Sequence, residues 1–362
     1  MCFDSENFEY EPNFIYKETI SNEADCLSNC DTFDYYKEKN NDIILVIPTI
    51  NPINFDNKDF YINLINLNNN NEIIKKLQGH KERITTLKIL INPKTKKEYL
   101  ISADKGENII VWDIQDNFKK IFQRKFEYEP YCFIYSTLII FSEKNTFIVA
   151  SSISEKNKTL IVDINKPQNL IEIKNSENLP VYCLCYWFNE EAEDDRDKHN
   201  IIQCGKNKIL ITQFQRNETY YEIITDEKYA YNSGGLVFNV KDKDYLAISA
   251  TSGLILIFDL INKNIVKKIE LENVHIFSFV KWNDSKLLLI DMRFSKIIII
   301  DINDNYKIIS KNYIPELGIA SFMKKIRHPN YGECFLINDK KWKIKLFALR
   351  GIRKKVLDDE DD

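Results

Sequence analysis

The stretch IIVWDI at residues 109–114 consists of four apolar residues followed by an acid and one more apolar residue. Close variants return as TLIVDI (159–164), ILIFDL (255–260) and IIIIDI (297–302). Each variant closes a short run rich in Ile, Val and Leu, the composition that favours a buried β-strand. The recurrence indicates that the chain is built from copies of one structural unit.

Aligning these copies on the acid gives the period of the unit. Asp113, Asp163, Asp259 and Asp301 are the clear positions, and weaker copies place Asn66 in YINLINL (61–67), Gln213 in KILITQF (208–214) and Ala348 in KIKLFAL (343–349). The seven positions are spaced by 47, 50, 50, 46, 42 and 47 residues. A period of about 40–50 residues is typical of the blades of a β-propeller.

Each period contains four strand-like segments separated by polar connectors. Around Asp113 these are RITTLKIL (83–90), EYLISA (98–103), NIIVWDI (108–114) and KKIFQRKF (119–126), and residues 274–311 repeat the pattern. Because no segment shows a sustained helical period, we predict an all-β fold, a seven-bladed propeller with four-stranded antiparallel blades. The predicted ring spans residues 13–357, and an acidic disordered tail follows at 358–362. The alternative fold is an open assembly of two β-sandwich domains.

One unit carries a recognisable motif. LQGH (77–80) followed by LISADKGENIIVWD (100–113) resembles a WD40 repeat, with Gly79-His80 before the first strand and Trp112-Asp113 closing the third. The resemblance implies a structural hydrogen-bonded tetrad to which His80, Ser102 and Trp112 contribute. Gly106 stands where the family has its turn aspartate, so neighbouring Asp104 or Glu107 is the substitute.

The other six units lack both motif pairs and are predicted from pattern alone. The tryptophan position is occupied there by Phe258, Ile300, Val162, Ile65, Thr212 and Phe347. The chain is therefore read as a divergent WD40-like, transducin-type propeller.

Closure of the ring has two candidate strands. NFIYKETI (13–20) precedes DCLSNCDTF (25–33), the expected inner strand of the first blade, and is placed to supply the outer strand of the last blade. The rival is ALRGIRKKVL (348–357). Only 14 residues follow Ala348, and the sequence leaves open which of the two segments closes the ring.

Charge and cysteine usage exclude several classes of partner. The net charge of −4 provides no basic field for nucleic acid or an anionic membrane, and no apolar run approaches the ~20 residues of a membrane-spanning helix. The N-terminus lacks the apolar region of a secretory signal. Eight cysteines without zinc-knuckle spacing indicate buried, reduced thiols and a cytoplasmic or nuclear location.

Catalytic and metal-binding patterns are not found in the sequence. Four histidines offer little material for a metal cage or proton relay, and neither a nucleophile elbow nor a phosphate-binding loop is present. SGG (233–235) is read as a turn leading into a strand, and the acidic run EEAEDDRD (190–197) as a solvated loop between the first two strands of the fourth blade. We expect no catalytic residue, cofactor or metal.

We therefore predict that the protein is a non-catalytic scaffold that binds other proteins or peptides. We expect it to be a monomeric ring within a larger complex. The alternative is a hydrolase-type propeller enzyme with carboxylates converging at the axis. Candidate contact residues lie in loops expected on one face: Lys81, Arg83, Lys105, Glu107, Arg293 and Trp342.

Overall fold

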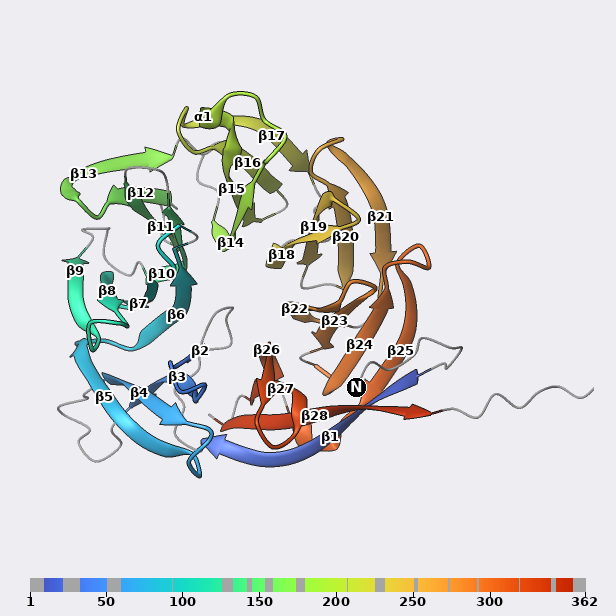
Figure 1. The fold of residues 1–362 in the computed structure, drawn as a ribbon. Coiled ribbons are helices and arrows are strands. Elements are labelled where there is room, and N and C mark those ends of the chain that lie inside the picture. Colours follow the sequence, from blue (N-terminus) through green and yellow to red (C-terminus); the bar gives the residue numbers. More distant parts are fainter. Residues whose placement is uncertain are drawn as a thin grey trace, which may run out of the picture.

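Seven four-stranded antiparallel sheets surround a central axis as the blades of a propeller (Figure 1). The computed structural model describes residues 10–21, 33–50, 60–92, 94–125, 133–141, 145–153, 159–173, 180–206, 208–224, 232–250, 253–272, 274–291, 293–318, 320–339 and 343–353. Within each blade the strands follow one another in sequence from the axis outward, except in the blade that contains both ends of the chain. The predicted fold class is confirmed.

The first three blades follow the chain without interruption. Blade 1 contains β2 (Asp34–Lys37), β3 (Ile43–Ile50), β4 (Phe60–Asn66) and β5 (Glu72–His80). Blade 2 contains β6 (Ile84–Ile91), β7 (Glu98–Asp104), β8 (Asn108–Asp113) and β9 (Lys119–Lys125). Blade 3 contains β10 (Phe133–Phe141), β11 (Thr146–Ile153), β12 (Thr159–Asp163) and β13 (Lys166–Ile173).

The remaining blades repeat the arrangement. Blade 4 contains β14 (Val181–Phe188), β15 (His199–Gly205), β16 (Lys208–Gln213) and β17 (Glu218–Ile224). Blade 5 contains β18 (Asn232–Val240), β19 (Lys243–Ala250), β20 (Leu254–Asp259) and β21 (Asn264–Glu270). Blade 6 contains β22 (Ile276–Asn283), β23 (Lys286–Asp291), β24 (Lys296–Asp301) and β25 (Lys307–Tyr313). Blade 7 contains β26 (Ala320–His328), β27 (Gly332–Asp339), β28 (Lys343–Arg353) and β1 (Tyr10–Ser21).

Helical structure in the described residues is limited to two short pieces. The four-residue helix α1 (Asp195–Lys198) lies between β14 and β15, and its first three residues belong to the acidic run 190–197, for which the sequence predicts a loop. Asp194 caps it by accepting a hydrogen bond from the Arg196 N–H. The 3₁₀ turn η1 (Pro315–Leu317) connects blades 6 and 7. No helix in the described part of the chain is long and apolar enough to cross a bilayer.

The N-terminal strand closes the ring. β1 pairs antiparallel with β28, with Phe14 opposite Leu349 and Ile15 opposite Ala348, so the N-terminal alternative is the one the structure adopts. The rival segment, up to Arg353, instead extends the third strand of blade 7, because pairing with the long β1 carries β28 past Ala348. Of the expected first inner strand, residues 25–32 lie outside the described residues, and the inner strand of blade 1 begins just after it, at Asp34.

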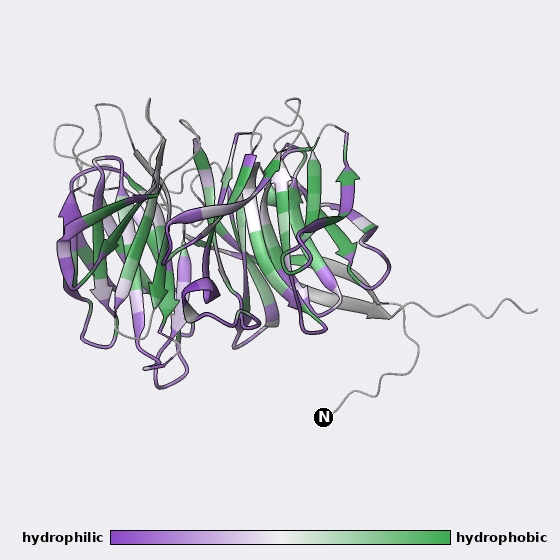
Figure 2. Ribbon diagram, turned by 90° about the horizontal axis from the view of Figure 1, so that it is seen from above, coloured by the Kyte–Doolittle hydropathy of each residue, from purple (hydrophilic) through white to green (hydrophobic). Residues whose placement is uncertain are grey.

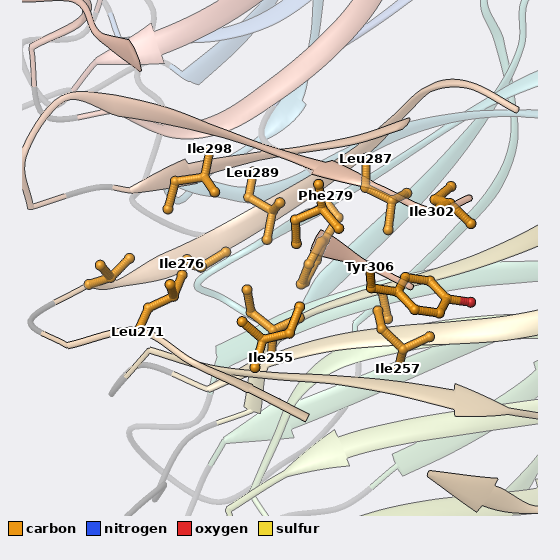
Figure 3. Close-up of a cluster of buried hydrophobic side chains, with 14 of the residues drawn as sticks. Ile255, Ile257, Leu271, Ile276, Phe279, Leu287, Leu289, Ile298, Ile302 and Tyr306 are labelled. Carbon is orange, nitrogen blue, oxygen red and sulfur yellow. The ribbon is translucent and has the colours of Figure 1, made fainter. Parts of the chain in front are cut away.

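The hydrophobic core lies between neighbouring blades. The third strands are buried along their length, as in β12 and β20, because sheets cover them on both sides. The outermost strands, such as β13, are mostly exposed. Figure 3 shows the contact between blades 5 and 6, where Ile255 and Ile257 of β20 face Phe279 of β22 and Leu287 of β23. Apolar residues follow the strands and polar residues gather in the connecting loops at both ends of the ring (Figure 2).

Candidate functional site

A hydrogen-bonded network lies at one end of blade 2, where β5 leads into β6. The two ring nitrogens of His80 contact Asp104 Oδ2 at 2.6 Å and Ser102 Oγ at 2.7 Å. The indole N–H of Trp112 donates to the same Ser102 oxygen at 3.0 Å. The network links the end of the blade 1 outer strand to the two middle strands of blade 2, so it fixes the loop between the blades.

The acid of this network is Asp104, two residues before the glycine at the expected position. Asp104 also accepts a hydrogen bond from the Asn108 N–H at 2.9 Å, which closes the turn between β7 and β8. Glu107, the other candidate, occupies the left-handed backbone region at φ 66° and donates its N–H to the Asp104 carbonyl. The turn is therefore built so that the carboxylate of Asp104 points back at His80.

Gly79 is required by close packing beside the network. A Cβ atom at this position would lie 2.9 Å from Ile110 Cδ1 and 2.6 Å from Lys120 Nζ. The lysine tail could move, but Ile110 is fully buried in the core. The ammonium group of Lys120 also lies 5.1 Å from the centroid of the Trp112 ring, a cation–π distance.

The structure brings only part of the predicted contact set together. Lys81 and Lys105 are exposed, Arg83 is half-buried, and the Lys105 N–H donates to the Arg83 carbonyl at 2.9 Å. This bond ties the loop before β6 to the loop after β7.

The other candidates do not join this surface. Glu107 is only 7% exposed and so offers little area to a partner, a correction that follows from the tight turn in which it sits. Arg293 is exposed but lies on blade 6, in the turn between β23 and β24, away from blade 2 around the ring (Figure 1). Trp342 lies outside the described residues.

The recurring acid of the sequence repeat has a structural role at the opposite ends of the blades. Asp259 Oδ1 accepts hydrogen bonds from the N–H groups of Ile261 and Asn262, and Asp113, Asp163 and Asp301 close the corresponding turns in the same way. The acid therefore ends the third strand by satisfying the backbone of the turn to the fourth.

Asp301 shows how such a turn stabilises the ionised form of its carboxyl group. Burial acts to raise the pKa of Asp301, but the Lys286 ammonium at 3.2 Å and two backbone N–H groups outweigh it. The pKa of the carboxyl is consequently lowered from its usual value. The charged form is thus part of the folded turn at neutral pH.

A cavity of about 490 Å³ lies where the inner strands meet at the axis. Its described lining combines apolar residues of β10, β14, β18, β22 and β26 with four lysines, at positions 88, 281, 324 and 325. Lys325 pairs with Glu333 at 2.8 Å, and Lys324 pairs with Asp34 of blade 1. The described lining contains neither a carboxylate nor a histidine, the groups on which the hydrolase alternative depends.

The described cysteines are free thiols, and all four are buried. Cys183, Cys185 and Cys204 share blade 4, whereas Cys334 lies on blade 7. Within the described ranges, no group of three or more His, Cys, Asp or Glu side chains is arranged to hold a metal ion. SGG (233–235) lies inside the inner strand β18 and does not form an entry turn, because Gly235 packs against the blade 4 thiols.

Comparison with solved structures places this ring among β-propellers. The β-propeller domain of Cps50 (Swd1) from Myceliophteria thermophila superposes with a TM-score of 0.67 at 14% identity, covering 93% of this chain and 100% of that domain. BBS1N, solved in complex with ARL6DN, superposes with a TM-score of 0.63 at 11% identity, covering 93% of this chain and 97% of that one. No family model and no curated protein sequence matches the chain. The protein is a seven-bladed β-propeller in its fold.

Proposed function

We propose that the protein is a non-catalytic interaction module that binds a partner protein or peptide on the face that carries the β5–β6 and β7–β8 loops. The observation that carries this proposal is the joined loop surface of Lys81, Arg83 and Lys105 beside the His80 network. Glu82 is exposed among these cations, so the surface is mixed with a positive excess. It suits a partner segment that presents carboxylates.

The physical basis of the proposal is preorganisation. The Lys105–Arg83 backbone bond and the His80–Asp104 contact hold both loops before any partner arrives. Binding to loops that are already ordered costs less conformational entropy than binding to mobile ones. BBS1N, a propeller of similar fold, was solved in complex with another protein, which supports a protein partner for this ring.

Affinity capture from the native cell followed by mass spectrometry tests the proposal. We expect Lys81→Glu combined with Lys105→Glu to lose partners that the unaltered ring retains. The matched control is Lys94→Glu combined with Lys96→Glu, which makes the same charge change in the β6–β7 turn at the other end of the same blade. Identical partner lists for the two double variants would contradict the proposed face.

The proposal includes a monomeric ring in the cytoplasm or nucleus. Blade 7 has four strands like the other blades, because β1 pairs with β28 as its outer strand. We expect light scattering of the purified protein to give the mass of a single chain. A dimer mass at micromolar concentration would contradict this part of the proposal.

A further inference from the structure

Three cysteine side chains converge at the boundary between blades 4 and 5. Cys183 and Cys185 are two residues apart on β14 and therefore share one face of the sheet. Cys204 on β15 stands directly opposite Cys183 in the strand register, so its side chain lies on that face too. The sulfur atoms of Cys183 and Cys185 are 3.9 Å apart.

Gly235 of β18 lies close to all three sulfurs. A Cβ atom placed on Gly235 would lie 2.7 Å from Cys185 Sγ, 3.4 Å from Cys204 Sγ and 3.5 Å from Cys183 Sγ. Any side chain at this position would press on the sulfur of Cys185. Because glycine has no side chain, residue 235 does not displace the three sulfurs from the face that they share.

We propose that Cys183, Cys185 and Cys204 form a three-sulfur binding site for a trivalent, thiol-seeking metalloid, with arsenous acid as the simplest ligand of this class. Condensation of the three thiols with As(OH)₃ forms three As–S bonds, breaks three As–O bonds and releases three water molecules. Each thiol proton leaves in one of those waters. The step needs neither oxidant nor reductant.

The charge balance favours this ligand over a metal cation. The three thiols are nearly or fully buried among apolar side chains of blades 4 and 5. Contact with Cys183, together with burial, raises the pKa of Cys185 and of Cys204. Three thiolates around a monovalent or divalent cation would leave net negative charge in this apolar setting, which is costly. The arsenic adduct is neutral before and after the reaction.

The axial cavity provides the approach. Cys183, Cys185 and Gly235 all belong to its lining, so the thiol cluster borders the space of about 490 Å³ at the centre of the ring. Arsenous acid is small and uncharged, so we expect it to approach Cys183 and Cys185 from this side; Cys204 is fully buried and is not part of the described lining.

Titration of the full-length chain with arsenite tests the proposal. In a background in which Cys2, Cys26, Cys30 and Cys132 are serine, we expect one arsenic per chain. The intact mass should rise by one arsenic atom less three hydrogens, and X-ray absorption should show three sulfur neighbours. Cys185→Ala and Cys204→Ala should each lower the affinity for arsenic at least about tenfold. Even the loss of a residue that only orients a ligand of a bound metal lowers metal affinity by that much.

Cys334→Ser is the matched control, because Cys334 is equally buried but lies on blade 7. We expect it to bind arsenic like the background protein. Circular dichroism melting curves identify which variants are folded, and only these are compared. The proposal is wrong if the folded background protein takes up no arsenic, if uptake survives Cys185→Ala unchanged, or if Cu(I) binds stoichiometrically where arsenous acid does not.

Discussion

Trp112 contributes to stability through the packing of its ring and through a hydrogen bond, and two substitutions can separate these contributions. Its ring is 3% exposed between blades 1 and 2, and its N–H is bound to Ser102. We expect Trp112→Ala to lower the free energy of unfolding by about 3–5 kcal/mol, the usual cost of deleting a buried aromatic ring.

Trp112→Phe keeps most of the volume but removes the hydrogen bond. We expect a smaller cost of about 1–3 kcal/mol, because a buried hydroxyl of the network loses a donor. Urea denaturation of both variants measures the difference. Equal midpoints for the two variants would show that the ring adds nothing beyond the hydrogen bond, and a Trp112→Phe midpoint equal to that of the unaltered protein would show that the hydrogen bond contributes nothing.

His328 gives the protein a predictable response to acid. Its Nδ1 accepts a hydrogen bond from the Asn330 N–H, and its Nε2 has no hydrogen-bond partner among the described residues. Burial lowers the pKa of His328 from 6.5, although the charge of Glu18 partly offsets this. Because the folded-state pKa is the lower one, its contribution to stability is complete above pH 6.5 and is lost as the pH falls towards the folded-state value.

We expect His328→Asn to reduce the loss of stability on acidification below pH 6.5. The amide oxygen of asparagine can accept the same bond but does not titrate in this range. Melting temperatures across pH 7.5 to pH 5, measured beside a His275→Asn control on another blade, provide the readout. A wild-type slope unchanged in His328→Asn would contradict the assignment.

β1 acts at the scale of the element, as the strand that closes the ring. Deleting residues 1–21 would expose the edge of β28 along the length that β1 now covers. We expect a lower melting temperature and self-association, because an unpaired edge strand is a template for pairing with another chain. Size-exclusion chromatography and thermal denaturation measure both effects.

Deleting only residues 1–9 is the control, since it leaves β1 whole. This shorter deletion should behave like the full chain. A monomeric and equally stable chain lacking residues 1–21 would show that β1 is dispensable for closure.

At the scale of the whole molecule, Asp34 connects three blades near the axis. It is 2% exposed, accepts the Ile89 N–H of blade 2 at 2.8 Å and pairs with Lys324 of blade 7. We expect Asp34→Ala to cost about 1.5–3 kcal/mol from the lost bond to a charged acceptor. The pair with Lys324 adds less, because the lysine side chain is 31% exposed.

A double-mutant cycle of Asp34→Ala and Lys324→Ala, followed by urea denaturation, separates the two contributions. The coupling energy should be positive but smaller than the effect of Asp34→Ala alone. Strict additivity of the two substitutions would show that the ion pair does not help to hold blade 7 to blade 1.

The sequence predicted much of the local structure but less of the candidate site. The strands of blade 2 were predicted to within about a residue, because apolar runs and polar turns have local causes. The acid of the network was left open between Asp104 and Glu107, since backbone conformation within the turn decides which carboxylate reaches His80. Blade 4 carries a related contact, from Gln203 Nε2 to Thr212 Oγ1 at 3.3 Å, that no WD40-type signal in its sequence indicates.

The sequence by itself determined the repeat, the number of blades and the position of each third strand, because one buried strand per period must be apolar and must end in a turn. Tertiary structure alone decided which segment closes the ring and which side chains meet across blades. The thiol cluster is the clearest case: spacing shows that Cys183 and Cys185 share a face, but strand register brings Cys204 to them and blade packing adds Gly235. These contacts join residues far apart in the chain, so no local pattern records them.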